Sequence, residues 1–130
     1  MSNFTEAELE YLASQKLGRL ATVGKDGMPH VVPTSFRHNA EHDSIDVGGH
    51  GLARSRKFAD VDREGRAAIV IDDVLPPWRP RGIEIRGRAE TVATGGEAFG
   101  YGFDPEVIRI RPARIRPWGL GDESQPRTIA

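Results

Sequence analysis

The chain alternates strand-like segments with short turns, and this alternation constrains the fold more than any other feature. Antiparallel strands can follow one another through tight turns, whereas parallel strands need crossover connections of about a dozen residues or more. Most links here are short and no strand–helix–strand unit repeats, which argues against a Rossmann-type parallel sheet. We therefore predict a mainly β, antiparallel barrel of six strands, at residues 17–23, 30–36, 44–49, 66–71, 81–93 and 106–111.

Two short helices are expected beside these strands, at residues 4–16 and 53–64. Thr5 and Glu8 have the spacing of a capping box at the start of the first helix. Gly18 ends the apolar spacing of that helix. The second helix follows a glycine-rich stretch and carries its own apolar contacts, so both helices are expected to pack on the barrel.

Turn residues and prolines locate the ends of several strands. Gly27 closes a hairpin turn, where we expect a positive φ. Pro33 inside the second strand indicates a sheet edge, a bulge, or a backbone group that is used elsewhere. Residues 66–71 form a continuous apolar run, which is typical of a fully buried strand. Residues 76–80 read as a rigid proline-rich loop and residues 95–104 as a glycine-rich one.

Length and composition favour one globular domain, residues 1–130, with a polar C-terminal tail from about residue 119. Apolar residues make up 38% of the chain and charged residues 28%, with a net charge of -1, so nonspecific nucleic-acid binding is not expected. We see no apolar run long enough to span a membrane and no secretory signal, which favours a cytoplasmic location. The absence of cysteine excludes disulfides and thiolate metal sites.

The sequence offers no assignable catalytic residue and no metal site. Its four histidines lack the HxxxH and HExxH spacings, and no serine lies in a G-x-S-x-G elbow. No acid–base pair has a spacing that indicates hydrolysis. If the protein is an enzyme, its chemistry is therefore expected to come from a cofactor that the chain positions.

The stretch that leads into the second helix has the composition of a phosphate site. Small residues allow a ligand to approach the backbone, and a helix N-terminus offers free amides with a partial positive charge. Three cations and a hydroxyl follow within one turn. The alternative is a glycine turn followed by a solvated helix face. The candidate phosphate-binding residues in this stretch are Gly49, His50, Arg54, Ser55, Arg56 and Lys57.

Three further segments combine groups that a ligand could use. Val31, Val32, Pro33, Thr34 and Ser35 offer hydroxyls and an interrupted hydrogen-bond ladder to a planar ligand, or form an ordinary edge strand. Trp78 and Arg79 lie on the rigid loop, where they could wall an anionic aromatic ligand, unless Trp78 packs as a lid on the core. Arg109 and Arg111 share a strand face and could bind anions, although pairing with Glu84 and Glu90 across the sheet is favoured.

The order of these motifs resembles a known family. A helix precedes Leu17-Gly18-Arg19-Leu20-Ala21-Thr22-Val23, then come Asp26-Gly27-Met28-Pro29-His30-Val31-Val32-Pro33, Ser55-Arg56-Lys57-Phe58, and Ala67 to Asp73. The segment 81–90 follows, together with Asp72 to Gly82 around the proline loop. The chain thus resembles the pyridoxamine 5'-phosphate oxidase-like split β-barrel proteins, and within them the actinobacterial flavin/deazaflavin oxidoreductases that use coenzyme F420.

The resemblance implies a fold, a cofactor site and a partner. It implies an FMN-binding-protein-like split barrel that forms a homodimer with two sites at the interface. Lys57 would hold the cofactor phosphate, assisted by Ser55, Arg56 and Arg54. The strand Val32, Pro33, Thr34 and Ser35 would run beside the cofactor ring, and Trp78 and Arg79 would close the site, from the second subunit or the same one. The short 95–104 segment would leave the substrate side open.

Three functions are compatible with the sequence. The first is an F420-dependent oxidoreductase that transfers a hydride between the reduced deazaflavin and a small conjugated or quinone-like substrate. The second is an FMN-binding flavoprotein or flavin reductase of the same fold, since a phosphate at Lys57 serves either cofactor. The third is a non-catalytic cofactor-binding protein.

Overall fold

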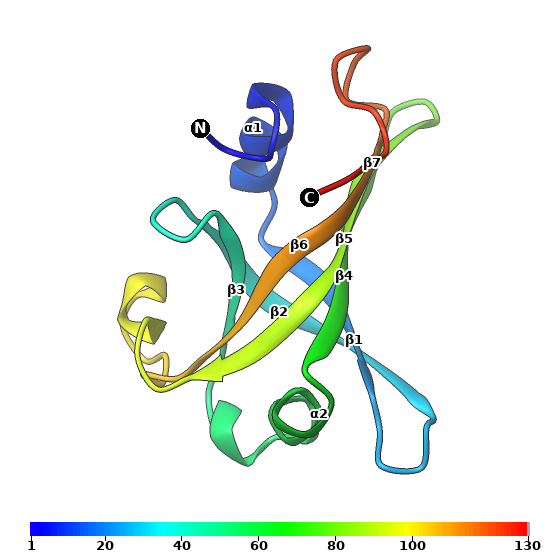
Figure 1. The fold of residues 1–130 in the computed structure, drawn as a ribbon. Coiled ribbons are helices and arrows are strands. Elements are labelled where there is room, and N and C mark those ends of the chain that lie inside the picture. The colour runs from blue at the N-terminus through cyan, green and yellow to red at the C-terminus, as the bar shows by residue number, and fades with distance from the viewer. Residues whose placement is uncertain (130) are drawn as a thin grey trace.

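The computed structural model describes residues 1–129 and is a closed antiparallel barrel of six strands. Figure 1 shows α2 at one end of the barrel, beside the β1–β2 hairpin, and α1 toward the other end, near both termini. The elements in chain order are α1 (Glu6–Ser14), β1 (Leu17–Val23), β2 (Pro29–Asn39), β3 (Ser44–Gly48), the 3₁₀ helix η1 (Leu52–Arg54), α2 (Arg56–Glu64), β4 (Arg66–Leu75), β5 (Arg79–Val92), the 3₁₀ helix η2 (Gly96–Phe99), β6 (Val107–Trp118) and β7 (Arg127–Thr128).

Strand pairing confirms the predicted antiparallel barrel and shows how it closes. The strand order is β3-β2-β1-β4-β5-β6, and pairing of β3 with β6 closes the barrel. In β2, residues 29–35 pair with β1, and only residues 35–39 pair with β3. Pro33 therefore lies on a part of β2 that has a single paired neighbour, which satisfies the constraint that proline places on a strand.

The local signals at the first helix and the first hairpin are confirmed. The Thr5 side chain accepts a hydrogen bond from the Glu8 amide, and the Glu8 carboxylate accepts one from the Thr5 amide, so both halves of the capping box are formed. Gly27 has a φ of 84° in the β1–β2 turn, a conformation that glycine adopts without steric cost.

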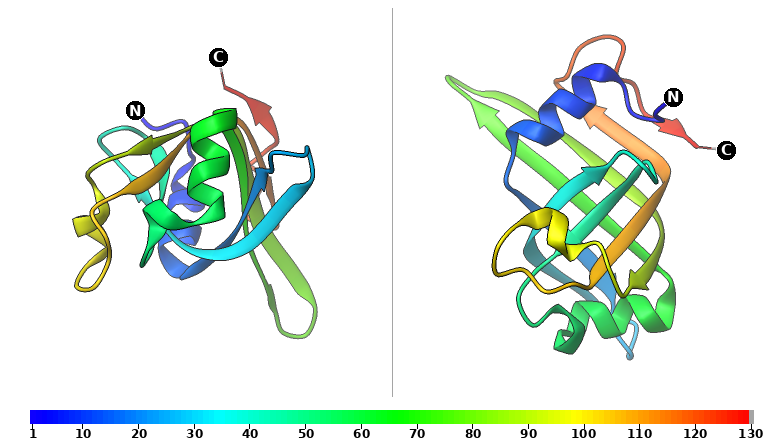
Figure 2. Two further views of the ribbon diagram at one scale, coloured as in Figure 1. Left: turned by 90° about the horizontal axis from the view of Figure 1, so that it is seen from below. Right: turned by 90° about the vertical axis from the view of Figure 1, so that its left-hand side faces the viewer.

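The structure corrects four expectations about the elements. The second helix begins at Arg56 rather than 53, because Ser55 caps it and residues 52–54 form the separate η1. Burial alternates along β4, so the run 66–71 has one outward face rather than being fully buried. The expected loop 76–80 is only a tight turn, since β4 and β5 extend into a long hairpin that projects from the barrel (Figure 2). β6 continues beyond 111 to Trp118, past a register shift opposite Gly87.

Side chains fill the inside of the barrel. Its core is dominated by isoleucines of β3 to β6 with almost no exposed area: Ile45, Ile69, Ile71, Ile83, Ile85, Ile108, Ile110 and Ile115. A small six-stranded barrel packed in this way has no room for a cofactor along its axis. Any cofactor must therefore bind outside the barrel wall or at its ends.

Within residues 1–129, no helix is long and apolar enough to cross a bilayer.

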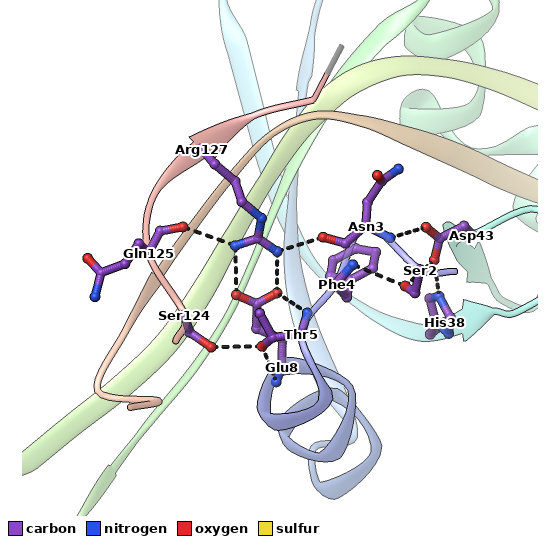
Figure 3. Close-up of polar contacts among 10 residues, drawn as sticks. All are labelled: Ser2, Asn3, Phe4, Thr5, Glu8, His38, Asp43, Ser124, Gln125 and Arg127. Atoms are coloured by element: carbon purple, nitrogen blue, oxygen red, sulfur yellow. Dashed lines mark hydrogen bonds and ion pairs between the residues drawn. The ribbon is translucent and has the colours of Figure 1, made fainter. Parts of the chain in front are cut away.

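The C-terminal segment is held against the N-terminal helix. Figure 3 shows the Arg127 guanidinium over the Glu8 carboxylate, with Nη2 and Nη1 at 2.6 and 2.9 Å from its two oxygens. Arg127 also donates to the backbone carbonyls of Asn3 and Gln125. Glu8 is fully buried. Part of the polar tail expected at 119–130 is therefore structured: Arg127 contacts Glu8 of α1, and β7 pairs with β6.

We expect Arg127→Ala to lower the free energy of unfolding by about 2–3 kcal/mol, because it leaves the buried Glu8 carboxylate without its cation. Urea denaturation measures the change. The matched control is Arg114→Ala on β6, because Arg114 is partly exposed and its side chain donates to the Thr128 hydroxyl. This variant should change stability by about 0.5 kcal/mol or less. Equal losses in the two variants would contradict the view that the Arg127–Glu8 ion pair holds the C-terminal segment against α1.

Candidate functional site

A groove runs between the β1–β2 hairpin and the first turns of α2. Its volume is about 660 Å³. It joins segments that are distant in the sequence, because α2 packs across the end of β1 (Figure 1). The groove is lined by Lys25, Asp26, His30, Arg54, Ser55, Arg56, Ala59, Asp60 and Arg63.

Ser55 shapes the side of the groove formed by α2. Its hydroxyl accepts a hydrogen bond from the Phe58 amide and donates to the Leu52 carbonyl at 2.6 Å. The amides of Arg56 and Lys57 are the first two of the helix and have no intrahelical acceptor. These amides form the positive end of the helix dipole, which attracts anions. Arg54, Ser55 and Arg56 line the groove, whereas Lys57 is half-buried elsewhere on the same turn.

A buried carboxylate organises the floor of the groove. Asp60 accepts hydrogen bonds from the Thr22 hydroxyl at 2.8 Å, from His30 Nδ1 at 2.8 Å and from Arg63 Nη2 at 3.0 Å. Burial alone would raise the pKa of Asp60, but the bonds from His30, Arg63 and Thr22 outweigh it and lower that pKa below its usual range. Asp60 is therefore an anion that its own neighbours already compensate.

The remaining cations of the groove have no such compensation. Within residues 1–129, Lys25, Arg54 and Arg56 form no ion pair. The nearby Asp26 carboxylate is used in its own turn, where it accepts from the Met28 amide. The groove thus carries surplus positive charge beside free helix amides, an arrangement that binds phosphate and carboxylate groups.

Sequence reasoning missed Lys25, His30 and Arg63 as members of this groove. His30 and Asp60 are thirty residues apart, and their contact depends on where α2 docks on the barrel. No local spacing carries that information. The only signal in the sequence was the position of both residues next to segments already singled out, the edge strand and the capped helix.

The glycine-rich loop before α2 already has an internal anion. The Asp104 carboxylate accepts hydrogen bonds from the amides of Gly51 at 2.6 Å and Leu52 at 3.3 Å. The Asp104 amide in turn donates to the Gly49 carbonyl. The ring of His50 lies 5.0 Å from that of Phe103. The 95–104 segment therefore folds back onto this loop, and the amides left for a ligand are those at the start of α2.

The edge of β2 presents the features expected beside a planar ligand. Val32 and Pro33 are exposed, Ser35 is half-buried, and the backbone of residues 29–34 is paired on one side only. Thr34 is buried, and its hydroxyl oxygen has no hydrogen-bond partner within the described residues. An unpaired buried hydroxyl is costly, so Thr34 has a polar group that a ligand on this strand could satisfy.

Trp78 and Arg79 lie far from these residues within one chain. They occupy the tip of the β4–β5 hairpin, at the end of the barrel opposite α2 (Figure 1). Trp78 is 75% exposed, so it is not a lid on the core of its own chain. The structure therefore keeps Arg54, Ser55, Arg56 and Lys57 together where η1 meets α2, and it leaves Trp78 and Arg79 apart from them.

Arg109 and Arg111 have different partners. Arg111 pairs with Glu90 on the neighbouring strand at 2.9 Å, which confirms the expected cross-strand pairing for that residue. Arg109 instead makes a bidentate pair with Asp46 of β3, with both contacts at 3.1 Å, and is buried. Arg109 is therefore not free to bind an external anion, whereas Arg111 is held by Glu90 at the surface.

The chain is similar in sequence to one protein family and to one named reductase over most of its length. The family model for pyridoxamine 5'-phosphate oxidase matches residues 4–119. A 5a,11a-dehydrotetracycline/5a,11a-dehydrooxytetracycline reductase of Streptomyces rimosus is 44% identical over 124 residues, which cover 93% of this chain and 87% of that protein.

Two solved structures share the fold at lower identity. One is a conserved hypothetical protein of Mycobacterium tuberculosis, with a TM-score of 0.71 and 22% identity over 93% of this chain and 91% of that one. The other is the heme storage protein of Vibrio cholerae, with a TM-score of 0.67 and 19% identity over 86% and 92% of the two chains. At these identities the likeness extends to the barrel alone.

Proposed function

The chain belongs to the pyridoxamine 5'-phosphate oxidase family, and on this premise we propose that it is a reductase that uses coenzyme F420. The family and the reductase relative support an oxidoreductase with a flavin or deazaflavin type of cofactor. The choice of F420 over FMN is our proposal. It rests on the surplus of cations in the groove, because F420 carries an oligoglutamate tail in addition to its phosphate and FMN does not.

The uncompensated cations beside the start of α2 carry this proposal. Ser55 and Arg56, which line the groove, would hold the cofactor phosphate with the free amides of the first helical turn. Lys57 lies outside that lining on the same turn, and we propose that its side chain reaches the phosphate from there. Lys25 and Arg54 would attract the carboxylates of the tail. The edge of β2, from Val32 to Ser35, would flank the ring, and the unpartnered Thr34 hydroxyl would gain a hydrogen bond there.

The chain's contribution to the reaction is binding and orientation. When bound, reduced F420 supplies a hydride to an electrophilic carbon. Fixing the two reactants side by side removes much of the entropic cost of their encounter. The substrate class follows from the relative, which reduces dehydrotetracyclines. We propose that this chain reduces a conjugated ketone, of the same fused-ring kind or smaller.

We propose that the functional unit is a homodimer. An outward row of apolar side chains, Val31, Ala21 and Ala68, crosses β2, β1 and β4, and Val31 is 67% exposed. Covering this row would remove apolar surface from water. A second copy would also give the exposed Trp78 and Arg79 a site to close, because their own groove lies at the other end of the barrel.

A paired titration of the purified apoprotein with F420 and with FMN tests the proposal. We expect tight binding of F420 and weak binding of FMN, followed by cofactor fluorescence and by heat. Preferential binding of FMN would instead favour a flavoprotein of the same fold. Binding of F420 without turnover of conjugated ketones and quinones would favour a non-catalytic cofactor-binding protein. Absence of binding to either cofactor would contradict the assignment of the groove.

A further inference from the structure

The groove contains an imidazole whose protonation state bears on anion binding. The Asp60 carboxylate can only accept hydrogen bonds, so the Nδ1 of His30, 2.8 Å away, must donate to it. The ring is thereby fixed with its proton on Nδ1 in the neutral form. Only Nε2 can still gain or lose a proton. The ring is partly exposed and lines the groove.

Charged groups from three elements line the groove together with His30. Lys25 and Asp26 come from the β1–β2 turn, and Arg54 comes from η1. Arg56, Asp60 and Arg63 come from α2. Asp60 already accepts hydrogen bonds from Thr22, His30 and Arg63. Without a ligand, His30 therefore shares the groove with four cations and two carboxylates, a net positive surrounding that a bound anion would offset.

We propose that binding of a multiply charged anion in this groove is coupled to the uptake of a proton by His30. A bound anion removes the repulsion from Lys25, Arg54 and Arg56 that otherwise opposes the imidazolium. Protonation in turn converts Nε2 from an acceptor, which repels an anion, into a donor. The inference deepens the proposed function, because it rests on the groove as the place where the cofactor's anionic groups bind.

The direction of the pH dependence follows from linkage. The complex binds more protons than the free protein, so anion affinity is greatest at low pH and falls as the pH rises. For a single linked proton, Kd rises by at most about tenfold for each pH unit. Imidazoles change charge between about pH 5 and 8. We expect an increase in Kd of about tenfold between pH 5.5 and pH 8.

Calorimetry with an N-acetylated triglutamate peptide tests the coupling. Its carboxylates stay ionised across this pH range, so any linked proton belongs to the protein. Titrations at pH 6.5 in two buffers of different ionisation enthalpy give the number of protons taken up. We expect uptake in the wild type and its loss in His30→Gln, whose side-chain amide can still donate to Asp60. The control His42→Gln, in the exposed β2–β3 turn, should behave as wild type.

A direct readout covers the case in which His30→Gln fails to fold. In the wild type, the Cε1 proton resonance of His30 should titrate with a higher pH midpoint in the presence of the peptide, while those of His38, His42 and His50 stay unchanged. Binding without proton uptake, or an unchanged midpoint for His30, would overturn the inference. Because the peptide contains no ring or phosphate, peptide binding with uptake supports the inference even if F420 fails to bind. F420 binding without uptake overturns it and leaves the proposed function standing.

Discussion

We expect Asp46→Ala to lower the free energy of unfolding by about 3–5 kcal/mol, the largest stability loss predicted for a single charged side chain in this protein. Asp46 is fully buried, accepts two bonds from Arg109, and also accepts from the Ser44 hydroxyl and the Asn39 amide. Its removal leaves the buried Arg109 guanidinium without its hydrogen-bonded carboxylate at the seam where β3 meets β6. Urea denaturation followed by circular dichroism measures the loss.

The control for this prediction is an ion pair of the same type on the surface. Glu90 and Arg111 also join neighbouring strands, but both side chains are about half exposed. We expect Glu90→Ala to cost about 0–1 kcal/mol, because water compensates each charge when its partner is lost. If Asp46→Ala cost no more than Glu90→Ala, the barrel would not depend on this pair to close.

Acid sensitivity provides an independent test of the same carboxylate. Burial raises the pKa of Asp46, but hydrogen bonds from Arg109, Asn39 and Ser44 outweigh it and lower the pKa below its usual range. The unfolded chain, with an aspartate pKa of about 3.9, then binds a proton more readily than the native state. The stability from Asp46 is therefore present above about pH 4 and is lost as the pH falls through the lower native value. Asp46→Asn should flatten the decline of stability below pH 4.

Local patterns in the sequence predicted the elements better than their partners. The capping box at Thr5 and the positive φ at Gly27 depend on neighbouring residues, and the structure has both. Of the three interpretations left open for Pro33, the structure matches the first, because that part of β2 is paired on one side only. The start of the second helix was misplaced, because Ala53 and Arg54 continue a helical composition and only the geometry of Ser55 shows the break.

Long-range partners could not be read in the same way. The alternation of β6 predicted that Arg109 pairs with a glutamate on β5. Glu90 of β5 does lie opposite Arg109, but barrel closure places Asp46 of β3 opposite it on the other side, and the guanidinium pairs with Asp46. Likewise, the composition of the glycine-rich loop predicted free amides, but Asp104, more than fifty residues later, takes two of them. Both pairings follow from register and docking, which adjacent residues do not encode.

The largest functional effect is expected from Lys57. We expect Lys57→Ala to weaken F420 binding by about 1.5–3 kcal/mol, the range for a hydrogen bond to a charged group. That corresponds to an increase in Kd of roughly 10- to 150-fold. Lys57 lies in the first turn of α2, next to free helix amides, and forms no ion pair within residues 1–129 that its removal would break. Fluorescence titration measures the change, and urea denaturation should show the fold intact.

Lys16→Ala is the matched control, because it removes the same charge from an exposed position just after α1, away from the groove. It should leave the Kd within about twofold of wild type, since exposed charges beyond about 10 Å are screened at ordinary ionic strength. Lys57→Arg should restore part of the affinity, because the charge is kept while the shape of the donor changes. Equal weakening by Lys16→Ala and Lys57→Ala would mean that the cofactor senses only net charge. The first turn of α2 would then not be where its phosphate binds.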